Sequence, residues 1–334
     1  MDSTDRTPPA PATLVLATCN VLNLASPGRV FYDNQAPYSS DEYARKIDWL
    51  GAQIRRLNAD VIGFQEIWDE TALRDAVAAS GLRYPHVAAP GAEQGATGTP
   101  RLGLASRWPV RELLSHAAFA AAQVVAIPDI GDHRAFERPV LEALVELPGE
   151  RGTMRVLIAH LKSKRPKFLQ DEAGQALEDR DDPAVQARAT LRSLTMRAAE
   201  AVALRMLVHS RLSRTREPLV LMGDLNDGPH AVTTQIVAAS QAIAYDRAAR
   251  DTALFHALEV QADPTIRRDV AYSHVHQGWP EVLDQVWISE ELVATSRFAI
   301  GEVRRVEYFN DHLQDGRDRA QSDHGFARAL VLLR

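Results

Sequence analysis

The chain has 334 residues, of which 46% are hydrophobic, enough to bury one large core or two ordinary ones. Its formal net charge of -6 excludes a strongly basic coat over the whole surface, although one basic groove can sit on an acidic protein. The single cysteine, Cys19, excludes an internal disulfide and a cysteine zinc cluster, which agrees with a reducing compartment, and we expect a cytoplasmic protein.

The first residues are typical of a tail. Residues 1–11, MDSTDRTPPAP, contain neither the basic and apolar regions of a secretory signal nor the ~20 apolar residues of a membrane span. Beyond them, no short-period repeat, low-complexity linker or composition break divides the chain. We predict a disordered tail over 1–12 and a single domain over 13–334, with no membrane span.

The first elements are two apolar runs around an amphipathic helix. Residues 14–17 predict a strand. Ser39 and Glu42 form a capping box, after which apolar residues recur every three or four positions and predict a helix over about 40–58. Residues 60–66, DVIGFQE, predict a buried strand.

Further strands and helices complete the chain. Four apolar runs follow without long helices between them, which is typical of antiparallel neighbours. They cover residues 101–106, 117–127, 138–147 and 153–161. Pro183 then opens a long helix that ends before Pro218. The remaining predicted elements are a strand at 219–222, a helix at 231–240 and strands near 270–275, 284–288, 296–304 and 325–332. This alternation predicts an α/β protein of layered sheets and helices, with two similar halves.

Several well-known catalytic motifs are absent from the sequence. The chain has no G-x-x-x-x-G-K-[ST] phosphate loop, no G-x-G-x-x-G, no H-E-x-x-H and no G-x-S-x-G. These absences argue against a nucleotide-driven enzyme, a dinucleotide-binding enzyme and a serine hydrolase.

Polar side chains instead close or follow the apolar runs. The clearest example is LMGDLNDGPH, residues 221–230, in which an apolar run ends on a glycine and several polar residues follow at once. Such strand-end loops commonly carry binding and catalytic groups on a rigid scaffold. The residues placed in this way are Asn20, Glu66, His160, Asp224, Asn226, Asp284, Asp323 and His324.

Taken singly, each of these residues also has a structural explanation. Asn20 fits a turn, His160 fits a satisfied core histidine, and Asp284 fits a helix cap or an ion pair. Taken together, they supply the carboxylate and amide oxygens that Mg²⁺ or Mn²⁺ prefers, and two imidazoles that donate hydrogen bonds. A cation held by carboxylates beside two histidines suits the cleavage of a phosphate ester.

These motifs give the chain a family resemblance. The segments TCNVLN, QE, HLKS, GDLN, LDQVWIS and SDH occur in this order between Asn20 and His324. In that order and spacing the chain resembles the endonuclease/exonuclease/phosphatase superfamily, which includes deoxyribonuclease I-like nucleases and sphingomyelinases. The resemblance implies a four-layer α/β/β/α sandwich, in which two mixed sheets pack face to face and a metal site lies at one edge.

The resemblance also implies a role for each matching residue. Glu66 would be the principal ligand of Mg²⁺ or Mn²⁺, with Asn20 and Asp323 beside it. Asp224 would orient or deprotonate the attacking water, and Asn226 would hold metal or phosphate.

The two histidines would act on the phosphate. His324, hydrogen-bonded to Asp284, would contact the phosphate and stabilise the transition state, or would help to activate the water. His160 would donate a hydrogen bond to a phosphoryl oxygen or protonate the leaving oxygen. In physical terms, a buried carboxylate partner raises the pKa of an imidazole and fixes its orientation, which keeps it cationic.

Two basic residues are further candidates for binding phosphate. The family often has an arginine where Arg138 stands, although an ion pair with Glu137 or Glu142 explains this residue equally well. Lys162 follows His160 by two positions and lies in a cluster of basic residues, which also fits a solvated loop.

We therefore predict a divalent-metal-dependent phosphodiester hydrolase, with a nuclease acting on DNA or RNA as the leading case. The alternative is a phosphoesterase acting on a small molecule or a lipid, as in sphingomyelinases, and a minor alternative is a non-catalytic binding module. The AHLKS segment disfavours the abasic-site enzymes, and the residues after GDLN disfavour the inositol phosphatases. No protein partner is implied.

Overall fold

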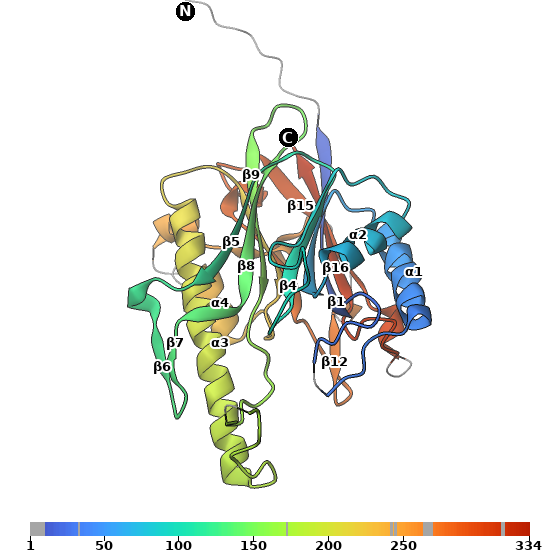
Figure 1. Cartoon of the computed structure of the whole chain (residues 1–334). Helices are drawn as coiled ribbons and strands as arrows, with labels where there is room; N and C mark the ends of the chain where they lie inside the picture. The colour runs from blue at the N-terminus through green and yellow to red at the C-terminus, as the bar shows by residue number, and fades with distance from the viewer. Residues whose placement is uncertain are drawn as a thin grey trace, which may run out of the picture.

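Two six-stranded mixed sheets form the centre of the molecule, and helices cover them on the outside (Figure 1). The structure is a computed structural model. It describes residues 11–32, 34–171, 173–240, 243, 246–262, 270–314 and 318–334. Most of the predicted tail, residues 1–10, lies outside the described residues.

The first sheet combines strands from both ends of the chain, whereas the strands of the second lie between Val110 and Ile288. The first sheet has the order β15 (Gly301–Phe309), β16 (Phe326–Leu333), β1 (Ala12–Leu24), β2 (Val61–Ile67), β4 (Arg101–Ser106) and β3 (His86–Ala88). The second has the order β11 (Phe255–His256), β14 (Asp284–Ile288), β10 (Leu219–Asp224), β9 (Thr153–His160), β8 (Ala135–Glu146) and β5 (Val110–Ala118).

Helices form the two outer layers. The first sheet is covered by α1 (Ser40–Leu57) and α2 (Glu70–Ala79), and the second by α3 (Pro183–Leu212) and α4 (Val232–Ala238). The short helix α5 is Ala257–Val260, and the 3-10 helices are Ala121–Gln123, Arg247–Thr252, Glu290–Leu292 and Asp311–Gln314. Two hairpins lie apart from the main sheets: β6 (Val125–Ile127) with β7 (Gly131–His133), and β12 (His274–His276) with β13 (Trp279–Glu281). The predicted four-layer sandwich is confirmed.

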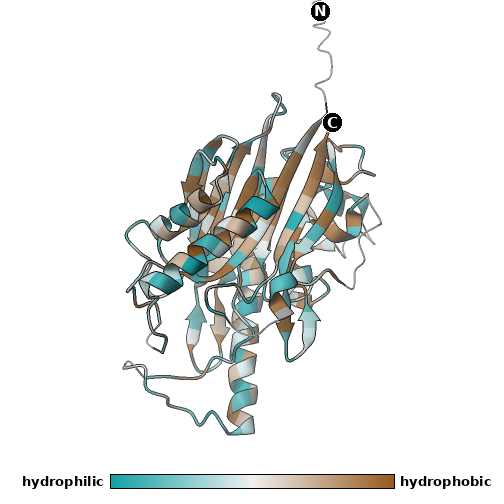
Figure 2. Ribbon diagram, turned by 90° about the vertical axis from the view of Figure 1, so that its right-hand side faces the viewer, coloured by the Kyte–Doolittle hydropathy of each residue, from teal (hydrophilic) through white to brown (hydrophobic). Residues whose placement is uncertain are grey.

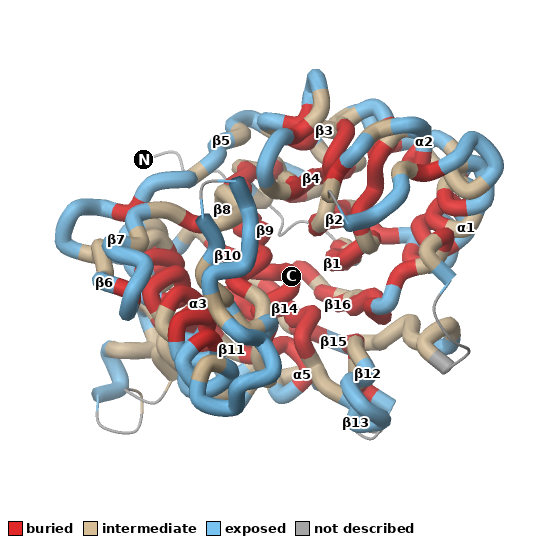
Figure 3. The backbone as a smooth tube through the Cα atoms, turned by 60° about the horizontal axis from the view of Figure 1, so that its bottom comes forward, coloured by how far each residue is buried: buried red, intermediate tan, exposed pale blue. Residues whose placement is uncertain are grey.

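Alternating side chains on the strands hold the layers together. On β10, Val220 and Met222 pack into the core between the sheets, whereas Leu219 and Leu221 pack toward α3. Such a strand is buried on both faces and is a continuous apolar run in the sequence. The central strands are accordingly rich in hydrophobic residues (Figure 2) and largely buried (Figure 3).

Four sequence predictions are wrong in detail. The strand predicted near 270–275 is only the short strand β12, His274–His276. The run 117–127 is not one strand, because its alanine-rich middle turns between the end of β5 and the short strand β6. The strand predicted at 296–304 begins only at Gly301 and continues to Phe309, where alternating charges had hidden it. The run 101–106 pairs with β2 and β3 in the first sheet, so it does not neighbour the strand that follows it.

Candidate active site

Three predicted site residues lie side by side on the second sheet. Asp224 at the end of β10 is in register with His160 at the end of β9 and with Asp284 at the start of β14. The parallel strands β9 and β10 end at the same edge, and the antiparallel β14 begins there. Asp224, Asp284 and His160 are all buried.

A glycine allows β9 and β10 to approach closely beside the site. Gly223 has φ +146°, and a Cβ placed on it would lie 1.9 Å from the carbonyl oxygen of Ala159. Any side chain there would push apart the two strands that carry His160 and Asp224. This is the physical reason for a glycine directly before Asp224.

Asn20 joins the first sheet to this group. Its Nδ2 donates to Asp224 Oδ2 at 3.1 Å and is 3.4 Å from Glu66 Oε1. Glu66 lies where the register between β1 and β2 shifts, between the paired residues Gln65 and Ile67, and has a left-handed backbone with φ +68°. Its other carboxylate oxygen accepts from the backbone N–H of Asn23 at 2.9 Å. The side chains from the two sheets therefore meet at one edge, opposite the edge where Ala12 pairs with Leu333.

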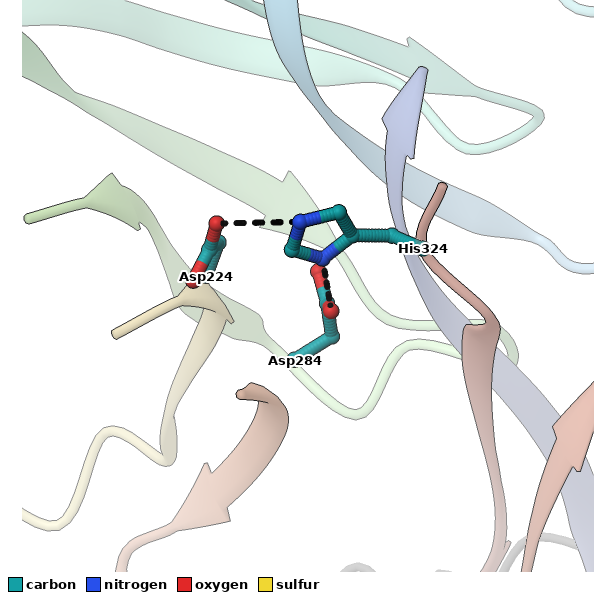
Figure 4. A group of neighbouring side chains, drawn as sticks. All are labelled: Asp224, Asp284 and His324. Atoms are coloured by element: carbon teal, nitrogen blue, oxygen red, sulfur yellow. Dashed lines mark hydrogen bonds and ion pairs between the residues drawn. The ribbon is translucent and has the colours of Figure 1, made fainter. Parts of the chain in front are cut away.

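His324 reaches the group from the turn before β16. Its Nδ1 is 2.7 Å from Asp284 Oδ2, and its Nε2 is 3.9 Å from Asp224 Oδ2 (Figure 4). The Ser322 hydroxyl accepts from the backbone N–H of His324 and donates to the backbone carbonyl of Asn20, which fixes the turn. Burial alone would lower the pKa of His324, but the carboxylates of Asp284 and Asp224 raise it well above 6.5.

The two histidines of the site have opposite protonation. Burial lowers the pKa of His160 well below 6.5, and the nearby charges of Arg138 and His324 lower it further. Its Nε2 lies 3.3 Å from Asp224 Oδ2, and its buried Nδ1 has no hydrogen-bond partner among the residues that the structure describes. His160 is therefore neutral at physiological pH, where it donates a hydrogen bond from one ring nitrogen but does not supply a proton as an imidazolium.

Asp224 is the point at which these contacts converge. Its Oδ2 faces Asn20, His160 and His324, and its Oδ1 accepts from the backbone N–H of Asn226 at 2.8 Å. Burial raises the pKa of Asp224, His324 lowers it, and Asp284 raises it again. A carboxylate with a raised pKa, held by several donors, has the character of a base that positions water.

Asn226, Arg138 and Lys162 lie around one loop after β9. The carbonyl of Leu161 accepts from Asn226 Nδ2 at 2.9 Å and from Arg138 Nη1 at 3.4 Å. Arg138 is also 3.8 Å from Glu137, the same carboxylate that lies 3.9 Å from Lys162. The alternative pairing of Arg138 with Glu142 does not occur, because Glu142 binds other cations. In the described part of the chain, the buried Nε of Arg138 has no hydrogen-bond partner.

The residues predicted to hold a metal offer suitable donors. Burial raises the pKa of Glu66, and the charge of Asp323 raises it further, so two carboxylates repel each other there. Asp323 itself is exposed. Within the described residues, the amide oxygen of Asn20 accepts a single long hydrogen bond, from Leu22 N–H at 3.2 Å. Two carboxylates and an amide oxygen are the ligand chemistry that Mg²⁺ prefers, so this donor set fits the ion.

A second acidic group lies next to these donors. Potential ligand atoms of Asp224, Asp284 and His324 all lie within 4.8 Å of one another. However, His324 Nδ1 and Asp284 already bind each other, which leaves the Nε2 atom of His324 facing Asp224. We therefore regard this trio chiefly as a hydrogen-bonded dyad beside a carboxylate.

The structure also adds residues that sequence reasoning missed. The Ser273 hydroxyl accepts from the backbone N–H of Asp284 at 2.8 Å, and the ring of His274 lies 5.0 Å from the ring of His324. Buried Lys46 lies near Glu66 and Asp323, and burial lowers its pKa to about 7. Only Ser322 belongs to one of the motifs, since it begins SDH; Lys46 lies in the predicted helix over 40–58 and Ser273 and His274 lie in the strand predicted near 270–275, where no motif marks them as site residues.

Comparison with known proteins identifies one family. A model of the Endonuclease/Exonuclease/phosphatase family matches residues 17–324. No curated protein sequence matches the chain. No helix in the described part of the chain combines the length and apolar character needed to cross a membrane.

Solved structures with the same fold cover nearly the whole chain. An endonuclease/exonuclease/phosphatase family protein from Bacteroides thetaiotaomicron has a TM-score of 0.59 and 12% identity, covering 97% of this chain and 99% of that one. The human nocturnin catalytic domain with bound sulfate has a TM-score of 0.55 and 15% identity, covering 96% and 95%. A mannosyl-6-phosphatase from Bacteroides thetaiotaomicron has a TM-score of 0.57 and 11% identity, covering 95% and 99%. At these identities the similarity shows the fold.

Proposed function

The chain belongs to the Endonuclease/Exonuclease/phosphatase family, and we propose that it is a divalent-metal-dependent phosphodiester hydrolase that cleaves nucleic acid. The observation that carries this proposal is the setting of Asp224. One buried carboxylate of raised pKa receives contacts from Asn20, His160 and His324, which come from three different segments of the chain. This is the geometry expected for a group that aligns a water molecule for attack on phosphorus.

Glu66, Asn20 and Asp323 are proposed to hold Mg²⁺ or Mn²⁺. Burial raises the pKa of Glu66, the negative charge of Asp323 raises it further, and a cation between the two carboxylates would relieve both effects. When bound, such an ion neutralises the phosphate anion and stabilises the charge that develops on the oxygens of the leaving group and the transition state.

His324 and His160 then act as two different donors to the phosphate. Because its pKa is raised, His324 carries a positive charge, and its Nε2 donates to a phosphoryl oxygen as negative charge builds up. His160 is neutral and donates a hydrogen bond, so of its two predicted roles we favour this one over proton transfer to the leaving oxygen. Asn226 donates from its side chain to the carbonyl of Leu161 and from its backbone N–H to Asp224, so it holds the Asp224 carboxylate in place relative to that loop.

Basic side chains beside the site support a polyanionic substrate. Arg138 and Lys162 lie next to the loop that follows β9. Three more basic residues, Lys164, Arg165 and Lys167, are exposed on the same segment. These cations would bind the phosphates on either side of the scissile bond, and such contacts are the main source of affinity for nucleic acid.

A small phosphoester is the second candidate substrate. The formal net charge of -6 disfavours a long polyanion away from the site. One solved structure of the same fold is a mannosyl-6-phosphatase, which by its name acts on a sugar phosphate. Such a substrate would need only the central group around Asp224 and the two donors Arg138 and Lys162.

A panel of substrates distinguishes the two candidates. Purified protein is incubated with plasmid DNA, RNA, bis(4-nitrophenyl) phosphate, sphingomyelin and a sugar phosphate, each in Mg²⁺, Mn²⁺ or EDTA. The proposal predicts cleavage of polynucleotide with metal and none in EDTA. Turnover of only the small esters would replace nucleic acid by the second candidate, and no turnover of any ester would refute both.

A further inference from the structure

Two buried charged side chains on α3 contact the active-site loops without belonging to any strand-end motif. Arg197 and Glu200 are one helical turn apart and are 5% and 0% exposed. Charged side chains are almost never buried without partners, so the role of Arg197 and Glu200 can be inferred from the groups that they contact. Both point from the helix layer toward the edge of the second sheet where the site lies, and α3 runs along that sheet in Figure 1.

Glu200 fixes two backbone segments at once. One of its carboxylate oxygens accepts from the backbone N–H of Glu137 at 2.9 Å, and the other accepts from the backbone N–H of Lys162 at 2.7 Å. Hydrogen bonds to an ionised acceptor are shorter and stronger than neutral ones. Glu200 therefore ties the strand that carries Arg138 to the loop that follows His160.

Arg197 fixes a third segment to the same loop. Its Nη1 donates to the backbone carbonyl of Lys162 at 3.3 Å, and its Nε donates to Asp227 Oδ2 at 2.9 Å. Asp227 directly follows Asn226, and the same carboxylate oxygen accepts from the hydroxyl of Thr233 at 2.6 Å. The N–H and the carbonyl of Lys162 are thus both held by α3, one by Glu200 and one by Arg197.

The segments held in this way are the ones that carry the phosphate-binding and water-positioning groups. Between them lies Leu161, whose carbonyl accepts from both Arg138 and Asn226. We propose that Arg197 and Glu200 are positioning residues, which set the spacing between Arg138, Lys162 and Asn226 through the backbone. This inference rests on the proposed hydrolase function.

Their effect on the reaction follows from geometry. Residues that orient groups in direct contact with the substrate typically contribute about 10- to 100-fold to activity, because a displacement of about 1 Å disturbs the alignment of reacting atoms. In Glu200→Gln the side chain keeps its size, but one acceptor oxygen becomes an NH₂ group facing a backbone N–H. One of the two segments is then released.

A matched control separates positioning from general stability. Glu142 is another buried carboxylate on the second sheet, 1% exposed, and it binds Arg155 and Arg211 rather than any active-site segment. Glu142→Gln and Glu200→Gln therefore both remove a buried charge. Each variant is compared with wild type by Tm and by kcat and KM for bis(4-nitrophenyl) phosphate with Mg²⁺, well below the lower Tm.

Both variants are expected to lower the Tm, but only Glu200→Gln is expected to lower kcat, by about 10- to 100-fold. Amide hydrogen exchange should also quicken in peptides containing Glu137 and Lys162 in that variant alone. If Glu200→Gln does not fold, Arg197→Lys provides the same test, since lysine keeps the charge near Asp227 but loses the planar fork that reaches the carbonyl of Lys162.

The outcomes separate the two claims. An active wild type, together with a Glu200→Gln or Arg197→Lys variant that keeps wild-type kcat and KM, overturns the positioning role and leaves the proposed function intact. A wild type that hydrolyses no phosphoester overturns the proposed function, and the positioning role with it. Equal losses of kcat in Glu142→Gln and Glu200→Gln would assign Glu200 to stability alone.

Discussion

Replacing Asp284 with asparagine removes the negative charge that holds His324 in its cationic form. The Nδ1 of His324 is 2.7 Å from Asp284 Oδ2, and Asp284 is fully buried, so water cannot take the place of the lost carboxylate oxygen. Asparagine has almost the same size. The substitution therefore tests the charge rather than the packing.

The size of the effect follows from this contact. A hydrogen bond between charged partners contributes about 1.5–3 kcal/mol. If the whole of that energy supports the donor in the transition state, kcat falls by about 10- to 150-fold, since each ~1.4 kcal/mol is tenfold in rate. The direction of the pH effect also follows. Because Asp284 raises the pKa of His324, the ring of His324 loses its positive charge at a lower pH in the variant than in wild type.

The assay is the pH dependence of kcat for bis(4-nitrophenyl) phosphate, supported by an NMR titration of the His324 ring in the metal-free protein. The wild type should keep its activity as the pH rises through neutrality, whereas Asp284→Asn should lose it. Asp60→Asn is the control, because Asp60 accepts from Val15 N–H at the far end of β2. An Asp284→Asn variant with the wild-type rate and an unchanged His324 titration would refute the reasoning.

Three further predictions concern stability and metal binding. Gly223→Ala should cost about 2 kcal/mol or more in urea unfolding, because a Cβ would meet the Ala159 carbonyl; an unchanged midpoint would show that the strands separate easily. Hydrogen bonds from His116 and Arg211 overcome burial and lower the pKa of Glu142 from 4.5 to about 2, so its contribution to stability is present above pH 4.5 and lost as the pH falls toward 2. Calorimetry should show that the Tm of Glu142→Gln falls less steeply with decreasing pH than the Tm of wild type. Identical pH dependences would show that Glu142 does not contribute to acid unfolding. Mg²⁺ should raise the Tm of wild type but not of Glu66→Gln, and an equal rise in both would place the ion elsewhere.

The sequence predicts the layers of the fold because its central strands are buried on both faces. Residues 156–159 and 219–222 are apolar throughout, and His160 and Asp224 follow them closely, so the strands and their ends are both visible in the sequence. Edge elements are harder to predict. The outer strand β15 has a polar, charged half, and its start was misplaced.

The positions of the site residues were also predictable, because strand ends gather at one edge of a sheet. His160, Asp224 and Asp284 meet through strand register, and Asn20 joins them from the other sheet. The roles of these residues remain proposals.

Contacts from the helix layer could not be predicted in this way. Arg197 and Glu200 lie within a helix whose sequence contains no functional motif. Their partners are mainly backbone groups that are distant in the chain. No local pattern records such contacts, since they depend on how α3 packs on the sheet.

The most direct test of the account is a metal-dependence assay on wild type and Asp224→Asn. Hydrolysis of bis(4-nitrophenyl) phosphate and of polynucleotide is followed in Mg²⁺, after chelation with EDTA, and after Mg²⁺ is restored. The proposed mechanism requires hydrolysis by wild type that EDTA stops and Mg²⁺ restores, and none by Asp224→Asn, whose Tm should remain close to that of wild type. Hydrolysis that survives in EDTA, or that Asp224→Asn retains at the wild-type rate, would contradict it.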